Sequence, residues 1–119
     1  MILTTEQIAK VCYGAIQSNL IAVDLTFAHT NWESTEAVDK EFCLAKVQFY
    51  LDNPEAGPEQ FHDRWMEKMR MAGWKHNLRL DKIEMGHPYL IPYQCLPDSD
   101  RMCQEIFCGI VRELSKLEV

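Results

Sequence analysis

Three closely spaced prolines, Pro88, Pro92 and Pro97, constrain the fold of this chain more than any other feature. They lie in the segment 74–97, where apolar residues show no helical period, although such a period is present on both sides. Proline lacks the backbone donor that a helix needs, so one continuous helix through this segment is excluded. The sequence therefore predicts a mainly α fold. We expect a compact domain of about four helices with a small β-hairpin, near 78–85, or an irregular proline-rich segment.

The first helix is predicted over about Thr5–Val23, because apolar residues recur there at the helical period. Thr4 and Gln7 have the spacing of a capping box, in which each side chain bonds the backbone N–H of the other residue. No period is visible in the segment 24–34, which we interpret as a connecting loop. Trp32 in this loop is expected to pack back onto the domain, since an indole buries a large apolar surface.

A second helix is expected to start at a cap formed by Ser34 or Thr35 and to end before Pro54, which pushes the preceding residue out of the helical region. Its apolar stripe is predicted at Val38, Phe42, Ala45 and Phe49. A third helix is expected to begin at Pro58 and to end at Gly73. Its apolar face is predicted at Phe61, Trp65, Met69 and Ala72.

The last helix is expected to start at Asp98 or Ser99, either of which can cap it. One face of this helix is predicted to carry Cys103, Phe107, Ile110, Leu114 and Leu117. We find no repeat or linker in the 119 residues, so residues 1–119 are predicted to form a single domain. Within it, a helical pair spans 1–54 and a second region spans 58–119.

The composition favours a folded protein of the cytoplasm. Hydrophobic residues make up 47% of the chain, yet no apolar run reaches the roughly 20 residues of a membrane span, and no signal peptide is recognisable. The cysteines are odd in number and scattered, which is typical of reduced thiols rather than of a disulfide framework. They are Cys12, Cys43, Cys95, Cys103 and Cys108.

The charge is unevenly distributed along the chain. The net charge is −6, which argues against a binder of long nucleic acids. The segment 64–82 nevertheless carries six basic residues against two acidic ones, a net charge of +4, which leaves −10 on the rest of the chain. Such a local cationic patch favours a small anionic ligand. The basic residues are Arg64, Lys68, Arg70, Lys75, Arg79 and Lys82.

A more specific pattern begins in the third helix. Its features are His62-x-x-Trp65-x-x-Lys68, Gly73-Trp74, Asp81, His87-Pro88, Pro92-Tyr93 and Leu96-Pro97. This pattern resembles the RyR domain, a repeat best known from ryanodine receptors, from about Pro58 to the C-terminus. The chain departs from the family at 75–77, where Tyr-Gly is replaced by His76-Asn77; His keeps an aromatic ring, and Asn tolerates a positive φ.

The resemblance implies a compact helical fold with a small hairpin and a nucleotide ligand. Paired repeats of the family can hold an adenine nucleotide between them, so a single copy per chain implies a homodimer. Relatives in bacteria and phages are associated with nucleotide sensing in conflict systems. The chain is then expected to act as a sensor or as an anti-defence protein that sequesters a cyclic or linear nucleotide, in the host cytoplasm if phage-encoded.

The predicted function is that of a non-catalytic binding module, without cofactor, metal or membrane partner. In it Trp65 and Trp74 stack on a base, while lysines and arginines neutralise phosphate. The full predicted ligand-binding set is Trp65, Lys68, Arg70, Trp74, Lys75, His76, Arg79, Lys82, His87 and Tyr93.

Several alternatives to these roles stay open at the level of sequence. Trp65 lies on an apolar stripe and can be a core residue, and the basic residues can form a solvated surface. His87 can be a structural residue oriented by Asp81, and Tyr93 can pack against Trp74. The main alternative function is a protein-interaction module whose tryptophans form its hot spot; its basic residues would be scattered, whereas those of a nucleotide site would converge.

Overall fold

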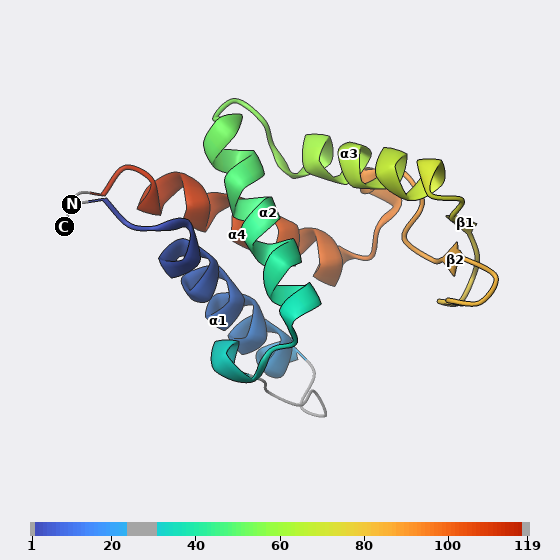
Figure 1. Cartoon of the computed structure of the whole chain (residues 1–119), viewed down its shortest axis with the longest axis horizontal. Helices are drawn as coiled ribbons and strands as arrows, with labels where there is room; N and C mark the ends of the chain where they lie inside the picture. Colours follow the sequence, from blue (N-terminus) through green and yellow to red (C-terminus); the bar gives the residue numbers. More distant parts are fainter. Residues whose placement is uncertain (1, 24–30, 118–119) are drawn as a thin grey trace.

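The computed structural model describes residues 2–23 and 31–117. In these residues there are four α-helices, two short 3₁₀ helices and a two-stranded sheet, which confirms the predicted mainly α fold (Figure 1). In chain order the elements are α1 (Thr5–Val23), η1 (Trp32–Ser34), α2 (Ala37–Asp52), α3 (Pro58–Met71), β1 (Lys75–His76), β2 (Gly86–His87), η2 (Tyr93–Cys95) and α4 (Asp98–Leu114). No helix within these ranges is long and apolar enough to cross a membrane.

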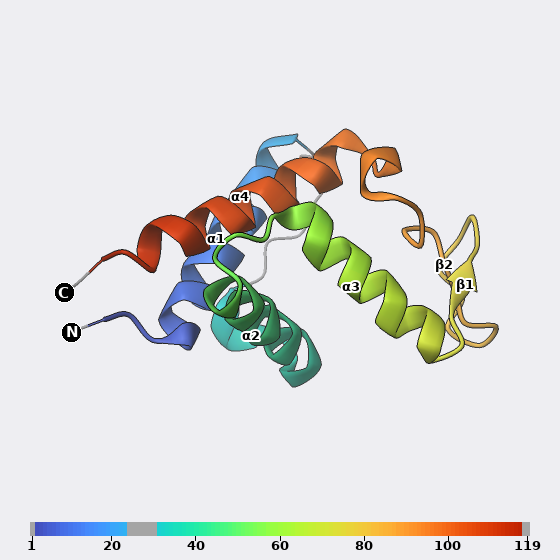
Figure 2. The same ribbon diagram turned by 90° about the horizontal axis from the view of Figure 1, so that it is seen from above.

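Helices α1, α2 and α4 pack together around the main hydrophobic core, which we call the bundle. Its buried residues are Ile8, Ala9, Cys12, Trp32, Val47, Tyr50, Phe107, Cys108 and Val111. Helix α3 runs away from the bundle and carries the two-stranded sheet at its far end (Figure 2). We call residues 58–96 the arm; the chain continues from its end into α4 of the bundle.

The predicted first helix has the expected bounds, and its capping box is present. The Thr4 backbone N–H donates to Gln7 Oε1 at 2.8 Å, and the Gln7 N–H donates to Thr4 Oγ1 at 3.1 Å. Trp32 is buried and packs edge-on against Tyr13, with ring centroids 5.8 Å apart, as predicted. The loop predicted at 24–34 lies, in its part 24–30, outside the described residues.

Helix α2 corrects two predictions. Its N-cap is Glu36, without a side-chain hydrogen bond, so neither Ser34 nor Thr35 caps it. The stripe predicted for the core is not the core face, since Val38 is 65% exposed and Phe42 is 47% exposed. The core side chains of α2 are Lys46, Val47 and Tyr50. The helix carries two apolar faces, and periodicity alone could not tell which one would meet α1 and α4.

The predicted stripe of α2 faces α3 instead. Phe42 and Phe49 meet Phe61 of α3 edge-on, with ring centroids 6.0 and 5.3 Å apart. Helix α3 begins at Pro58 as predicted, and Gly73, with a φ of +97°, follows its end. The predicted face of α3 is only half-buried at Phe61, Trp65 and Met69, and Ala72 is exposed. The side chains that α3 buries are Pro58, His62 and Met66.

The sheet differs from the predicted hairpin. Strands β1 and β2 pair in parallel, Lys75 with Gly86 and His76 with His87, and they flank the segment 78–85 rather than lie in it. Within the turn, Asp81 and Gly86 form an isolated antiparallel bridge. Among the described non-glycine residues, Met85 has a positive φ, of 58°, so the left-handed conformation expected for Asn77 is found at Met85.

Helix α4 starts one residue earlier than a cap at Asp98 would give and two earlier than a cap at Ser99 would give. Its N-cap is Pro97, without a side-chain bond, while Asp98 is the first helical residue and forms a close ion pair with Arg101. An acidic residue in the first turn is stabilised by the helix dipole. Phe107 of the predicted face is buried, but Leu117 lies beyond the helix and is exposed.

Candidate functional site

A cavity of about 530 Å³ lies between α2 and α3, and we call this cavity the groove. Its floor is mainly aromatic and aliphatic, and polar side chains stand among these residues. It is lined by Phe42, Ala45, Gln48, Phe49, Asp52, Asn53, Phe61, Arg64, Trp65, Lys68 and Met69. A volume of this size suits a small-molecule ligand.

A second cavity of about 280 Å³, which we call the pocket, lies next to the groove. Helices α2, α3 and α4 contribute to it, together with β2 and the segment that follows it. It is lined by Phe42, Phe61, His62, Trp65, His87, Tyr89, Leu96, Asp100 and Gln104. The two cavities share Phe42, Phe61 and Trp65, so a single elongated ligand can contact both.

Trp65 lines both the groove and the pocket, as Phe42 and Phe61 do. Its indole stacks on His62, with ring centroids 5.5 Å apart and an interplanar angle of 28°. His87 makes an edge contact with the indole, with ring centroids 5.0 Å apart. Trp65 is half-buried, so it is neither a fully buried core residue nor an open surface residue. Such a fixed, partly open indole can stack on a planar ring.

Two cations line the groove, Arg64 and Lys68, one turn apart on α3. The Arg64 guanidinium lies over the Phe49 ring, 5.5 Å from its centroid, so this side chain packs along the groove. Lys68 belongs to the predicted binding set, whereas Arg64 was not in it. Its sequence signal was its position four residues before Lys68, which places both on the same helix face.

The structure separates the other predicted cations from this site. Arg70, Lys75, Arg79 and Lys82 line neither the groove nor the pocket and are exposed on the arm, as is His76. Trp74 is half-buried and lines neither cavity; it makes an edge contact with His87, with ring centroids 6.3 Å apart. Of the predicted residues, the structure therefore brings Trp65, Lys68 and His87 together and places the rest elsewhere.

Polar groups from three segments line the pocket. The Tyr89 N–H donates to His87 Nδ1 at 3.0 Å, which fixes the imidazole, and burial lowers the pKa of His87. Asp81 does not orient this ring, because its carboxylate accepts the backbone N–H groups of Ile83 and Glu84. Burial, followed by a hydrogen bond to Asp100, raises the pKa of Tyr89. The pocket thus offers both donors and acceptors to a ligand.

Lys46 lies behind the pocket and is almost fully buried. Its ammonium donates to the side-chain oxygen of Gln104 and lies between two rings, 5.1 Å from the centroid of Phe61 and 4.5 Å from that of Phe107. Burial lowers the pKa of Lys46 to about 8. Lys46 engages the oxygen of Gln104, so the N–H groups of this amide can still donate to a ligand.

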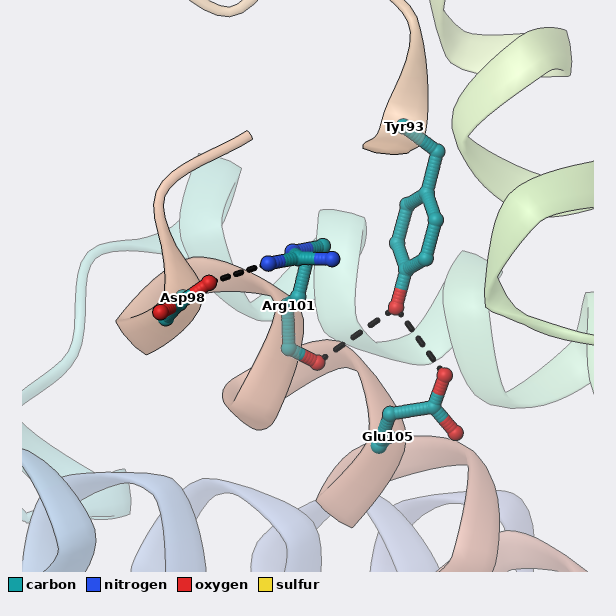
Figure 3. Close-up of polar contacts among 4 residues, drawn as sticks. All are labelled: Tyr93, Asp98, Arg101 and Glu105. Atoms are coloured by element: carbon teal, nitrogen blue, oxygen red, sulfur yellow. Dashed lines mark hydrogen bonds and ion pairs between the residues drawn. The ribbon is translucent and has the colours of Figure 1, made fainter. Parts of the chain in front are cut away.

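Tyr93 joins the arm to α4 of the bundle, whereas the hydrogen bond of His62 lies within the arm. His62 Nε2 lies 2.7 Å from the carbonyl oxygen of Ile91, which links α3 to the segment before η2. Tyr93 packs against His62, with ring centroids 6.1 Å apart, and lines neither the groove nor the pocket; packing against Trp74 was the alternative left open by the sequence. Its hydroxyl donates to Glu105 at 3.0 Å, and the carbonyl oxygen of Arg101 lies 3.4 Å away (Figure 3). Burial, then the bond to Glu105, raises the pKa of Tyr93 to about 12.

Metal-ligating side chains are dispersed in the part of the chain that the structure describes. Among those residues there is no group of three or more His, Cys, Asp or Glu side chains that could hold a metal ion. All five cysteines are free thiols; Cys12 and Cys108 are buried, and Cys95 is exposed.

The comparison with known families agrees with the pattern around α3. A family model of the RyR domain matches residues 52–117, which is more than half of the chain and includes α3, the sheet and α4. No curated protein and no solved structure matches the chain significantly. Through its 52–117 region, which contains the residues of the arm and most of the site, this chain belongs to the RyR domain family.

Proposed function

We propose that this chain is a non-catalytic ligand-binding module and that its ligand is a nucleotide, held across the groove and the pocket. The observation that carries the proposal is the position of Trp65. Its indole borders both cavities, with the cations Arg64 and Lys68 on one side and hydrogen-bonding side chains on the other. A nucleotide has the matching parts: a planar base, a polar base edge and an anionic phosphate.

The charges favour one orientation of the ligand. The pocket contains the carboxylate of Asp100, which repels phosphate, so the base belongs in the pocket beside Trp65. There the amide of Gln104 donates to an acceptor on the base edge. The phosphate belongs in the groove with Arg64 and Lys68, where charge-assisted hydrogen bonds are strongest. The groove also contains Asp52, which accepts a hydrogen bond from Gln48 at 2.8 Å.

This site differs from the predicted one in its phosphate-binding residues. The sequence assigned phosphate to five cations, of which only Lys68 lies in the groove. In the proposed site, Arg64 takes the phosphate-binding role of the other four cations, which lie outside the nucleotide site. The module acts as a sensor or by sequestration, and the homodimer and the anti-defence role implied by the family stay predictions. Sedimentation velocity with and without ligand tests the homodimer.

A second candidate function is a protein-interaction module without a small-molecule ligand. One observation favours it: Arg70, Lys75, Arg79 and Lys82 do not converge on the groove or the pocket, as the cations of a nucleotide site should. The convergence of Arg64 and Lys68 on an aromatic groove favours the nucleotide proposal. The two candidates differ in whether a small molecule alone stabilises the protein.

The test is a thermal-shift screen against mono-, di- and cyclic nucleotides. A ligand that binds only the folded state adds about 2.7 kcal/mol of stability at 100 times its Kd, which shifts the melting temperature of a domain this size by several degrees. We expect one nucleotide class to produce this shift. Circular dichroism on each variant confirms that it is folded before binding is compared.

Matched substitutions locate the site. Trp65→Ala is expected to weaken binding by about 10-fold to 100-fold, the stacking energy of a base, whereas Trp74→Ala retains the wild-type Kd. The double variant Arg64→Ala and Lys68→Ala is expected to weaken nucleotide binding and to reduce its salt dependence. The double variant Arg79→Ala and Lys82→Ala is expected to leave both unchanged. The absence of a shift across the screen, or equal losses in each matched pair, would contradict the proposed site.

A further inference from the structure

The turn between β1 and β2 exposes large apolar side chains. Leu78 is 87% exposed, Ile83 is 91% exposed and Leu80 is 54% exposed. We call residues 77–85 the tip. Figures 1 and 2 both place it at one end of the long axis of the molecule, opposite the chain termini. A cluster of large exposed apolar side chains usually marks an interaction site, whereas such side chains scattered singly are ordinary on a protein surface.

The backbone of the tip is held in place, so these side chains are presented on a fixed turn. Asp81 and Gly86 exchange two backbone hydrogen bonds of 2.8 Å. The carboxylate of Asp81 accepts the N–H groups of Ile83 and Glu84 at 3.1 and 3.0 Å. Leu78 and Ile83 therefore stay exposed while the backbone around them is hydrogen-bonded.

The charges around the tip are mainly positive. Lys75, Arg79 and Lys82 are exposed there, while the carboxylate of Asp81 is turned to its own backbone, which leaves Glu84 as the exposed acidic residue of the turn. The segment 64–82 carries a net charge of +4 in a chain of net charge −6. The molecule is 46 Å long, several times the Debye length of about 8 Å at physiological salt, so the acidic bundle is largely screened from the tip.

We propose that the tip docks onto the surface of an anionic lipid membrane, with Leu78 and Ile83 inserted at the headgroup level and Arg79 and Lys82 on the lipid phosphates. A convex tip with aliphatic side chains and surrounding cations matches an apolar layer covered by anionic headgroups. The groove of a second copy is a poorer match, because Arg64 and Lys68 line it and repel the cations of the tip. This peripheral docking differs from the sequence expectation of no membrane partner, and it does not depend on the nucleotide site.

Vesicle co-sedimentation tests the proposal with the full chain. The probes are vesicles of phosphatidylserine and phosphatidylcholine in equal parts, and vesicles of phosphatidylcholine alone. We expect the protein to sediment with the mixed vesicles and much less with the neutral ones. Leu78→Ser with Ile83→Ser should lower the partition coefficient about tenfold, because two apolar side chains are lost from the lipid. The matched control is Val38→Ser, an exposed apolar residue on α2.

Charge reversal gives a second, independent readout. Arg79→Glu with Lys82→Glu should abolish the preference for anionic vesicles. The control is the double variant Lys10→Glu and Lys116→Glu, which changes the net charge by the same amount away from the tip. It should keep the preference for anionic vesicles. No sedimentation with mixed vesicles, or equal sedimentation of the tip variants and the wild type, overturns the proposal. Lipid-free self-association that Leu78→Ser with Ile83→Ser removes also overturns it, in favour of a contact between copies.

Discussion

The bundle and the arm are held together by different kinds of contact. In the bundle, Ile8, Cys12, Val47, Cys108 and Val111 are almost completely buried, and their packing joins three helices. In the arm, much of the structure depends on hydrogen bonds and ring contacts. These are the bond from His62 to the Ile91 carbonyl, the capping of the turn by Asp81, and the edge contacts of Trp65 and Trp74 with His87.

This difference explains where the site lies. A close-packed core leaves little room for a ligand, whereas helices that meet only partly leave a groove between them. The half-buried residues Phe61 and Trp65 form that boundary between arm and bundle. We therefore expect changes in the bundle to unfold the whole chain and changes in the arm to act locally.

The largest effect is expected from Phe107→Ala. Phe107 is buried in the bundle, and its ring packs against Tyr50, with centroids 6.3 Å apart. Truncating a buried phenylalanine typically destabilises a protein by about 3–5 kcal/mol. Urea denaturation followed by circular dichroism measures the change, with Val38→Ala on the exposed part of α2 as control. A loss below about 1 kcal/mol would show that the bundle does not dominate stability.

A smaller and local effect is expected from Gly86→Ala. An added Cβ would lie 2.6 Å from Asn77 Cβ, so the strand pair must shift. Overpacking of this kind typically destabilises by about 1–3 kcal/mol. Hydrogen exchange should show faster opening at the amides of Lys75 and Asp81, while α1 keeps its protection.

The matched control is Gly109→Ala on α4, where an added Cβ meets no atom within 4 Å. Alanine in place of a mid-helix glycine should raise stability by roughly 0.5–1 kcal/mol. Faster exchange throughout the bundle in Gly86→Ala would mean that arm and bundle unfold as one unit.

Lys46 gives the bundle a pH-dependent stability. Its folded pKa is lowered from 10.5 to about 8, so the unfolded chain binds more protons between these values, and stability rises with pH there. From pH 7 to 9 the gain is about 1 kcal/mol. Above pH 9 the trend reverses in part, because burial raises the pKa of Cys12 from 9.0 to about 12.

Replacing Lys46 by Met should remove this rise, which urea denaturation at several pH values measures. Lys10→Met is the control. A hydrogen bond to Glu33 raises the pKa of Lys10 above 10.5, so this residue titrates above the measured window. A rise that persists in Lys46→Met would assign it to another group.

The smallest effect is expected from Glu33→Gln. Its carboxylate pairs with Lys10 Nζ at 2.6 Å, and both side chains are more than half exposed. Exposed ion pairs contribute little, because water and salt screen them. The melting temperature should stay within error of the wild type at physiological salt, and a clear drop would mean that this contact fixes η1 against α1.

The sequence predicted the helices better than their contacts. The start of α1 depends on Thr4 and Gln7, and the start of α3 depends on Pro58, all of which act within one helical turn. The inward face of α2 was predicted wrongly, because Phe42 and Val47 lie on two apolar faces of similar pattern. For the site, Trp65 and Lys68 of the predicted ligand-binding set line the groove, and so does Arg64, which was not in that set; their role in binding stays a prediction.

The sequence by itself determined the mainly α class, most helix ends and the RyR domain family, because prolines, glycines, caps and a spaced motif are local features. Only the tertiary structure decided that Trp65 lines two cavities and that Arg79 and Lys82 lie away from them. These relations depend on how helices cross and how the turn after β1 folds back. Contacts between residues far apart in the chain set that geometry, and no local pattern encodes it.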